Sequence, residues 1–231
     1  MAYALLKSFL TPLLMLFFRP KVTGLRLVPT TGPVIIASNH LSFSDSIFMP
    51  LVVPRKVTFL AKSEYFTSPG LKGLVKKLTF KALGQVPVDR AGGRRSEQAI
   101  LTGLQLLADG NCIGIYPEGT RSPDGRLYKG RTGIARMAIE SGAPIIPVAM
   151  FNTAEIQPTG QVVPKVRRVE MVFGEPMYFT GDSSDLKVLR EVTDQIMKSI
   201  GELSQQEYVD IYASEAKAAI ARERNYLKDE D

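Results

Sequence analysis

The chain has 231 residues, of which 45% are hydrophobic, so it is long enough for one α/β domain with a sizeable core. Its one cysteine, Cys112, excludes an internal disulfide, and the sequence contains no Cys/His cluster with zinc-ligand spacing. This cysteine usage fits a reducing compartment, and the apolar run around Cys112 predicts a small core residue, not a nucleophile.

The formal net charge of +6 is unevenly distributed along the chain. Ten Lys and Arg accompany only two acidic residues between Arg55 and Arg95, whereas from Gly201 to Asp231 eight acidic residues accompany four basic ones. A basic middle region suits nucleic acid, anionic lipid or a phosphorylated substrate, and on charge alone a solvated basic face is an equal alternative. The sequence carries no recognition-helix or aromatic RNA-binding motif, so nucleic acid is not expected as a partner.

The first eighteen residues are mostly apolar, and Lys7 is their one charge. As a helix they would span about 27 Å at roughly 1.5 Å per residue, which is marginal for crossing a bilayer, and Pro12 interrupts the stretch. The Arg-Pro-Lys sequence that follows lacks the small residues of a secretory cleavage site. We expect residues 1–20 to form a hydrophobic helix in the membrane interface, on the cytoplasmic face of the cell membrane, with Arg19 and Lys21 near anionic head groups. A core helix and a single membrane span are the alternatives.

The rest of the chain alternates between short apolar runs and helical patterns. Strands are predicted at residues 22–28, 34–37, 57–60, 85–88, 112–116, 145–149 and 169–173, and helices at 72–81, 96–108, 133–140, 185–200 and 205–226. A short helix should begin at Asp45, with Ser44 as its N-cap and Pro50 limiting its length, and Gly110 should end the helix at 96–108. This alternation predicts a single α/β layered domain with a mostly parallel central sheet flanked by helices. The Ala-rich last helix is expected to pack or cap the domain and not to form a site.

The only histidine, His40, follows the apolar run at 34–37, and the carboxyl ends of such strands are where α/β sheets bind ligands. Asp45 lies five residues later, which would place the two side chains on different faces of one straight helix. If His40 lies in a loop and Asp45 starts the helix, the carboxylate can fold back to the imidazole, hold its tautomer and stabilise the imidazolium. Alternatively, Asp45 only stabilises the helix N-terminus, and both roles are compatible.

Two further segments follow predicted strands and carry residues suited to phosphate. In the sequence Tyr-Pro-Glu-Gly-Thr-Arg-Ser at 116–122, Gly119 would let the backbone approach a ligand, and Arg121 offers a planar fork for phosphate. A plain β-turn is the alternative for this segment. The segment at 84–90 ends in Arg90, which by itself suits a surface position equally well. If these residues converge with Lys62 and Lys129, His40 would lie beside a cationic cradle for phosphate.

In this order and spacing, the segments resemble the glycerolipid acyltransferase family, whose best-known member is 1-acylglycerol-3-phosphate acyltransferase. Asn39-His40 with Asp45 resembles the first block of that family, residues 84–90 the second, 116–122 the third and Ile-Pro-Val at 146–148 the fourth. The resemblance covers roughly residues 33–148, and the apolar N-terminus stands where the family carries its membrane anchor. Tyr116 replaces the usual phenylalanine, which is a conservative departure.

The resemblance implies that His40, oriented by Asp45, is the general base for an acceptor hydroxyl that attacks the thioester of acyl-CoA or acyl-carrier protein. The implied acceptor is a lysophosphatidate, 1-acylglycerol 3-phosphate, and the product is phosphatidic acid. No metal, cofactor or acyl-enzyme is expected, and the sequence has no Gly-x-Ser-x-Gly nucleophile motif. Residues 21–231 would form the acyltransferase domain with its C-terminal amphipathic helices. The residues expected to bind the acceptor are Arg90, Glu118, Gly119, Thr120 and Arg121, with Lys62 and Lys129 as further cations.

Three alternatives to this function remain open from the sequence. Glycerol 3-phosphate or another lysophospholipid could replace lysophosphatidate as the acceptor. Water could replace the acceptor, which would make the chain a thioesterase. A non-enzymatic, peripheral lipid-binding protein would use the basic region and the apolar N-terminus but not His40.

Overall fold

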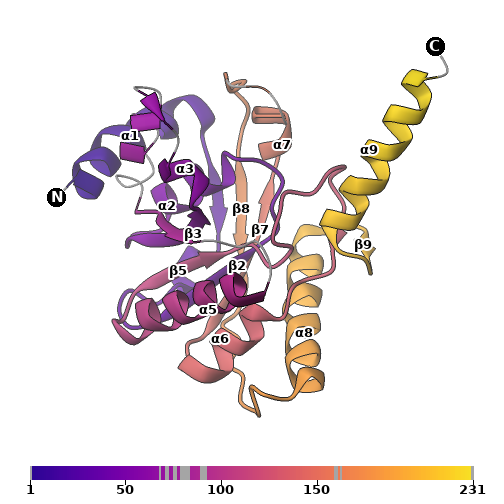
Figure 1. The fold of residues 1–231 in the computed structure, drawn as a ribbon. Helices are drawn as coiled ribbons and strands as arrows, with labels where there is room; N and C mark the ends of the chain where they lie inside the picture. The colour runs from indigo at the N-terminus through magenta and orange to yellow at the C-terminus, as the bar shows by residue number, and fades with distance from the viewer. Residues whose placement is uncertain are drawn as a thin grey trace.

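The structure is a computed structural model that describes residues 2–229, apart from residues 68, 71–72, 75–76, 79–83, 89–92, 159–160 and 162. In this part of the chain a seven-stranded sheet has the order β1-β8-β7-β2-β5-β3-β4. The five strands from β7 to β4 run parallel, β8 is antiparallel to β7, and β1 runs with β8. Helices cover both faces, so the predicted α/β layered domain with a mostly parallel sheet is confirmed (Figure 1). The strands of this sheet are β1 (Lys21–Thr23), β2 (Val34–Ser38), β3 (Val57–Lys62), β4 (Val86–Val88), β5 (Cys112–Ile115), β7 (Ile145–Phe151) and β8 (Glu170–Phe173).

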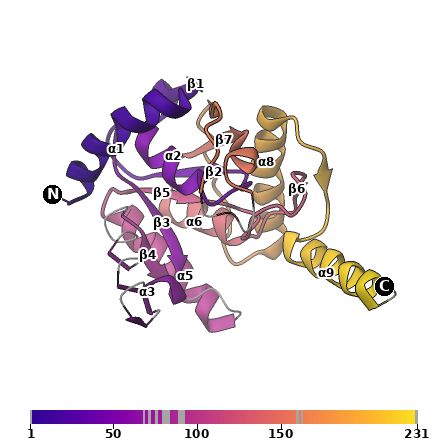
Figure 2. The same ribbon diagram turned by 90° about the horizontal axis from the view of Figure 1, so that it is seen from above.

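The central strand β2 is buried along its whole length because the sheet has a hydrophobic layer on each side. Successive side chains of a strand point to opposite faces. Val34 and Ile36 accordingly join one core cluster, with residues of α1 and α2, and Ile35 and Ala37 join the other, with residues of α5, α6 and α8. The view from above separates these two groups of helices (Figure 2). The helices are α1 (Ala2–Phe18), α2 (Asp45–Val52), α3 (Glu64–Thr67), α5 (Gly93–Ala108), α6 (Gly133–Ser141), α7 (Thr153–Ile156), α8 (Leu186–Ser204) and α9 (Ala213–Asp229).

The first strand is shorter than the sequence predicts. Instead of a strand at 22–28, β1 ends at Thr23 and a 3₁₀ helix covers Leu25–Leu27. The change occurs at Gly24, whose φ of 75° lies in the left-handed region. A Cβ on Gly24 would lie 2.2 Å from the carbonyl oxygen of Phe173, so only glycine fits beside β8.

The short helix after His40 begins at Asp45 as predicted, but its two other predicted features are wrong. Ser44 has helical dihedrals and makes no side-chain cap; its hydroxyl lies 3.1 Å from that of Ser42. The helix also continues past Pro50 to Val52. It ends there because Val53 precedes Pro54, and a residue before proline is forced from helical to extended dihedrals.

The predicted helix at 205–226 is wrong at its start. Gln205 adopts a left-handed φ of 56° and ends α8. The chain then forms β9 (Tyr208–Val209), which pairs in parallel with β6 (Leu127–Tyr128), before α9 begins at Ala213. α9 extends away from the sheet in both ribbon views (Figures 1 and 2). The predicted helix at 72–81 lies largely outside the described residues.

The expected N-terminal helix is present as α1, and it packs on α2 through one side only. Phe18 is buried in the core, whereas Phe9, Leu16 and Phe17 are more than half exposed. The ammonium of Lys7 donates to the carbonyl of Val53 at the end of α2, and burial lowers the pKa of this lysine. None of the helices, over the residues described, is both long and apolar enough to cross a membrane.

Candidate active site

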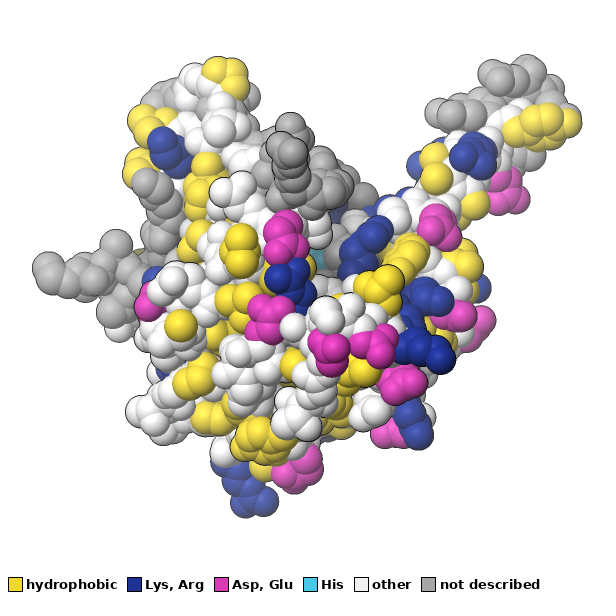
Figure 3. Space-filling view, turned by 60° about the horizontal axis from the view of Figure 1, so that its bottom comes forward, with side chains coloured by type: hydrophobic (Ala, Val, Ile, Leu, Met, Phe, Trp, Pro, Cys, Tyr) yellow, Lys and Arg dark blue, Asp and Glu magenta, His cyan; other side chains and the backbone are white. Residues whose placement is uncertain are grey.

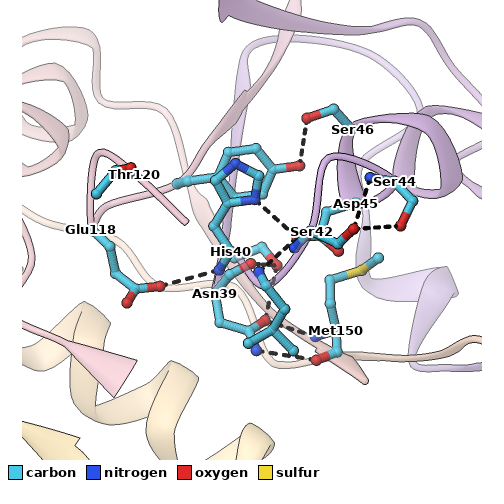
Figure 4. A network of polar contacts seen from close by, with 12 residues as sticks. Asn39, His40, Ser42, Ser44, Asp45, Ser46, Glu118, Thr120 and Met150 are labelled. Atoms are coloured by element: carbon cyan, nitrogen blue, oxygen red, sulfur yellow. Dashed lines mark hydrogen bonds and ion pairs between the residues drawn. The ribbon is translucent and has the colours of Figure 1, made fainter. Parts of the chain in front are cut away.

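The site begins where β2 ends, with His40 and Asp45. The chain leaves the sheet after Ser38 and turns, so that Asp45 at the start of α2 folds back onto the imidazole. Nδ1 of His40 lies 2.9 Å from Oδ2 of Asp45, and the same oxygen accepts the backbone N–H groups of Leu41 and Ser42, each at 2.8 Å. The carboxylate is fully buried, and the imidazole is 16% exposed. The geometry therefore fits a histidine with one nitrogen held by a carboxylate and Nε2 pointing away from it (Figure 4).

The stack between His40 and Tyr116 fixes the plane of the imidazole. The two ring centroids are 3.8 Å apart with an interplanar angle of 8°. The hydroxyl of Tyr116 lies 3.0 Å from that of Ser46 on α2, so the tyrosine is itself held in place. A phenylalanine at this position would keep the stack and lose the hydroxyl contact. Sequence reasoning treated Tyr116 as a conservative departure and missed this contact.

Asn39 joins the end of β2 to the neighbouring strand β7. Its side-chain amide donates to the carbonyl of Met150 at 3.1 Å, and its oxygen accepts the N–H of the same residue at 2.8 Å. The amide also donates to Oε1 of Gln206, which follows α8, at 2.8 Å. Asn39 is buried, and it thus holds the backbone next to His40 against two distant parts of the chain. The block pattern includes Asn39, but nothing local in the sequence points to Gln206.

The turn after β5 brings the segment at 116–122 against His40. The N–H of Gly119 donates to the carbonyl of Tyr116 at 3.0 Å, which closes the β-turn that the sequence allowed as an alternative. Gly119 has a φ of 75°, and Arg131 lies across its Cα face. The N–H of Ser122 donates to the carbonyl of His40 at 2.7 Å. The turn is therefore part of the site, and it holds the backbone of the histidine loop.

Glu118 lies inside this turn and is only 1% exposed. Its two carboxylate oxygens accept the backbone N–H groups of His40 at 3.1 Å and Tyr128 at 3.0 Å. Burial raises the pKa of Glu118 to about 7, against the opposing effect of these two donors. The carboxylate thus holds the backbone of His40 (Figure 4), a contact that the sequence does not predict, and the acceptor contact that the resemblance implies stays a prediction.

One hydroxyl residue and one cationic residue of the turn, Thr120 and Arg121, are accessible to solvent. The side chains of Thr120 and Arg121 are partly exposed. Within the described residues the guanidinium of Arg121 makes no hydrogen bond or ion pair, whereas the hydroxyl of Thr120 accepts from Lys217 of α9 at 2.7 Å. The last helix therefore packs against this turn, a contact that the sequence does not predict.

The remaining predicted cations differ in their placement. Lys129, directly after β6, forms an ion pair with Asp210 at 2.9 Å, and its proposed contact with the acceptor stays a prediction. Lys62 is the last residue of β3, and its side chain lies outside the described part. Arg90 also lies outside the described residues. Across the described ranges, no three side chains of His, Cys, Asp or Glu are grouped as metal ligands.

The family described as Acyltransferase matches residues 19–151, which is more than half of the chain and includes all four sequence blocks. The chain belongs to the acyltransferase family. The resemblance drawn from the blocks is thus confirmed.

Relatives of this acyltransferase include proteins named 1-acyl-sn-glycerol-3-phosphate acyltransferase. One from Bacillus subtilis is 29% identical over 68% of this chain and 73% of its own length. A chloroplastic protein of that name from Brassica napus is 29% identical over 81% of this chain, and one from Arabidopsis thaliana is 27% identical over 80%. The chain spans about half the length of these two plant relatives, 53% and 50% respectively.

A solved structure supports the fold of this acyltransferase. The crystal structure of the 1-acyl-sn-glycerophosphate acyltransferase PlsC from Thermotoga maritima matches with a TM-score of 0.62. The match covers 85% of this chain and 80% of that one, at 24% sequence identity. At this identity the likeness establishes the shared fold.

Proposed function

We propose that this acyltransferase transfers a fatty acyl group from a thioester, acyl-CoA or acyl-carrier protein, to the hydroxyl of 1-acylglycerol 3-phosphate, giving phosphatidic acid. The observation that carries the proposal is the 2.9 Å contact between Nδ1 of His40 and Oδ2 of Asp45 at the carboxyl end of β2. The names of the relatives support the choice of acceptor.

The chemistry follows from the position of the imidazole. Asp45 holds the proton on Nδ1, so Nε2 is free to accept the proton of the acceptor hydroxyl. The oxygen attacks the thioester carbonyl, and the tetrahedral intermediate collapses with loss of the thiolate, which takes the proton back from Nε2. The buried carboxylate stabilises the imidazolium between these two transfers. The acyl group passes directly to the acceptor, and no residue of this chain is acylated.

The phosphate of the acceptor requires a cation near the base. Arg121 lies three residues after Glu118, whose carboxylate contacts the backbone of His40, so the arginine belongs to the turn that borders the histidine loop. A guanidinium binds phosphate through two parallel hydrogen bonds. In a glycerol 3-phosphate backbone, the hydroxyl that reacts and the phosphate are on neighbouring carbons. An acceptor with its hydroxyl at Nε2 therefore needs a cation close to the base, which a thioesterase does not.

The test of the base is His40→Ala, assayed with an acyl-CoA and lysophosphatidate in detergent micelles. We expect turnover to fall at least about a hundredfold, the usual contribution of a general base. Asp109, exposed at the end of α5, supplies a control: Asp109→Ala should leave turnover unchanged. Near-wild-type turnover of His40→Ala would contradict the assignment. The same assay with glycerol 3-phosphate and other lysophospholipids identifies the acceptor, and Arg121→Ala with unchanged thioester cleavage would indicate a thioesterase.

We further propose that the molecule binds an anionic membrane surface through the end of α1 and the loop before β8. The exposed Leu16 and Phe17 of α1 line a cavity of about 580 Å³ together with residues 166–168, which read Val-Arg-Arg. The N–H of Val169 donates to the carbonyl of Phe18, so the loop and the helix end are held side by side. Exposed apolar side chains bordered by arginines suit the interface of an anionic bilayer.

This surface and His40 lie at the same end of the strands. β8 and β1 run antiparallel to the five parallel strands, so both begin at the end of the sheet where β2 and β7 finish. The hydroxyl of Ser42, next to the histidine loop, donates to the carbonyl of Gln157 at 2.8 Å, at the start of the connection to β8. A lipid acceptor held in a membrane at this edge would lie on the side of the molecule where the base is.

A further inference from the structure

We propose that Lys217, on the C-terminal helix α9, forms part of the subsite for the acceptor's phosphate, together with Arg121. This inference rests on the proposed function and extends it beyond residues 19–151, the range that the family covers. It assigns a binding role to a helix whose sequence predicts only packing.

Lys217 contacts the turn after β5. Its ammonium donates to the hydroxyl of Thr120 at 2.7 Å, and the side chain is partly buried. Thr120 immediately precedes Arg121, so the turn combines a cationic residue of its own with one from the C-terminal helix. A lysine ammonium contributes a point charge to phosphate, which complements the planar fork of an arginine.

Contacts with the rest of the fold hold the start of α9 in place. Arg131 donates to the hydroxyl of Ser214 at 3.1 Å and lies over the ring of Tyr212, with 4.6 Å between Cζ and the ring centroid. Ala213 and Ala216 pack on the fully buried Tyr128. Because these contacts flank Lys217 on the first turns of the helix, its position is set by packing on β6 and the turn. Figure 3 shows Lys and Arg side chains gathered where α9 joins the rest of the molecule, beside a small histidine-coloured surface.

The charge of Lys217 acts on Glu118, which contacts the backbone of the proposed base. The charge of Lys217 acts to lower the pKa of Glu118, against the larger effect of burial, which places the ammonium near this carboxylate. Glu118 in turn accepts the backbone N–H of His40. The cation and the histidine loop therefore both border the turn at 116–122, as an acceptor with neighbouring hydroxyl and phosphate requires.

This short range also favours the acceptor over the donor as the source of the phosphate. Coenzyme A and acyl-carrier protein both carry phosphate, but the long pantetheine arm separates it from the thioester. A phosphate bound beside the histidine loop belongs to the smaller of the two substrates. The kinetic constants for donor and acceptor distinguish these two sources.

The experiment compares Lys217→Ala and Lys217→Arg with wild type, using acyl-CoA and lysophosphatidate. We expect the KM for lysophosphatidate to rise about tenfold in Lys217→Ala, the effect of losing one charge-assisted contact, with kcat changed by less than about threefold. Lys217→Arg should recover most of the loss, and the KM for acyl-CoA should stay the same. Arg222→Ala, which removes a charge from an exposed position on the same helix, should match wild type.

A binding measurement separates this role from a structural one. Without ligand, wild type, Arg222→Ala and Lys217→Ala should have the same Tm. Lysophosphatidate should raise the Tm of wild type and of Arg222→Ala, and it should raise the Tm of Lys217→Ala by less. Equal ligand-induced shifts and equal acceptor KM in wild type and Lys217→Ala would overturn the inference, as would a rise confined to the KM of acyl-CoA. A wild-type enzyme that acylates no acceptor, while Lys217→Ala still loses lysophosphatidate binding, would overturn the proposed function and leave this inference standing.

Discussion

At the scale of single residues, Asp45 makes three contacts with one oxygen. Oδ2 accepts from Nδ1 of His40 and from the N–H groups of Leu41 and Ser42, whereas Oδ1 has no partner within the described residues. The two backbone donors shape the loop, and the imidazole contact orients the base. The carboxylate thus combines the imidazole contact that the sequence predicts with two loop contacts that it does not, because the loop folds around it.

The substitution Asp45→Asn separates these roles. An amide oxygen in the place of Oδ2 can still accept from the backbone and from Nδ1, but without the negative charge it no longer stabilises the imidazolium. We expect kcat to fall by about 10³ to 10⁴, as in other histidine–carboxylate pairs, with a small change in Tm. Steady-state kinetics and thermal unfolding measure the two effects, and Asp109→Asn is the matched control. A kcat within tenfold of wild type would contradict the proposed role of Asp45.

Glu118 predicts a pH dependence of stability. Burial raises its pKa from 4.5 to about 7, so the folded state binds this proton more tightly than the unfolded chain does. The contribution of the group to stability is therefore fully present below about pH 4.5 and is lost as the pH rises through about 7. The corresponding decrease in the free energy of unfolding is about 3 kcal/mol.

Urea denaturation of Glu118→Gln between pH 4.5 and 7.5 tests this dependence. The variant should be less stable than wild type at low pH, because its amide NH₂ would face the N–H of Tyr128 or of His40, and two donors cannot form a hydrogen bond. Because the amide does not titrate, the stability of the variant should decline less steeply with pH than that of wild type. Glu191→Gln, an exposed position on α8, should keep the wild-type slope. Equal slopes in Glu118→Gln and wild type would contradict the raised pKa.

At the scale of elements, close approaches decide where strands and helices end. β1 stops at Gly24 because the backbone turns there at a positive φ and passes directly against Phe173. Gly32 adopts nearly the same φ, 74°, but a Cβ there would meet no atom within 4 Å. Substitutions at these two glycines therefore distinguish the cost of backbone strain alone from the cost of strain together with a steric clash.

We expect Gly32→Ala to cost about 1 kcal/mol of stability, from the left-handed backbone alone. Gly24→Ala should cost clearly more, roughly 3 kcal/mol, because its Cβ also displaces the backbone of β8. Urea denaturation of both variants measures the difference. Equal losses would show that the loop at Gly24 shifts without cost, which would contradict the tight contact with Phe173.

At the scale of the whole molecule, the sheet order places the base and the proposed membrane surface at one edge. The exposed end of α1 and the arginines at 167–168 reach this edge because β1 and β8 run opposite to β2. The arrangement depends on antiparallel pairing between β7 and β8, which no local pattern announces. In the proposed orientation, the end of the strands that carries His40 faces the lipid.

Vesicle sedimentation tests this orientation. We expect wild type to bind vesicles of equimolar phosphatidylcholine and phosphatidylglycerol more tightly than pure phosphatidylcholine. Reversing both charges, Arg167→Glu with Arg168→Glu, should weaken binding to the anionic vesicles at least about tenfold. The matched control is Lys187→Glu with Lys198→Glu, two exposed lysines of α8, which changes the net charge by the same amount. Equal loss in the two double variants would contradict a defined membrane surface.

The sequence by itself determines the family, the layered α/β fold and the pairing of His40 with Asp45. These features are local: a buried strand, a loop and a helix start lie within a dozen residues, and their apolar spacing and turn chemistry decide the conformation. It also identifies Cys112 as a core residue; burial raises the pKa of its thiol to about 12, which keeps it protonated.

Only the tertiary structure decides which distant residues complete the site. Gln206 meets Asn39 across 167 positions of sequence, and Lys217 meets Thr120 across 97. Both contacts follow from the pairing of β6 with β9, two strands too short to be read from an alternating pattern. The same pairing brings Lys129 to Asp210, an ion pair that the sequence does not predict. A side chain's role here depends on packing between segments, and packing is fixed only when the whole chain has folded.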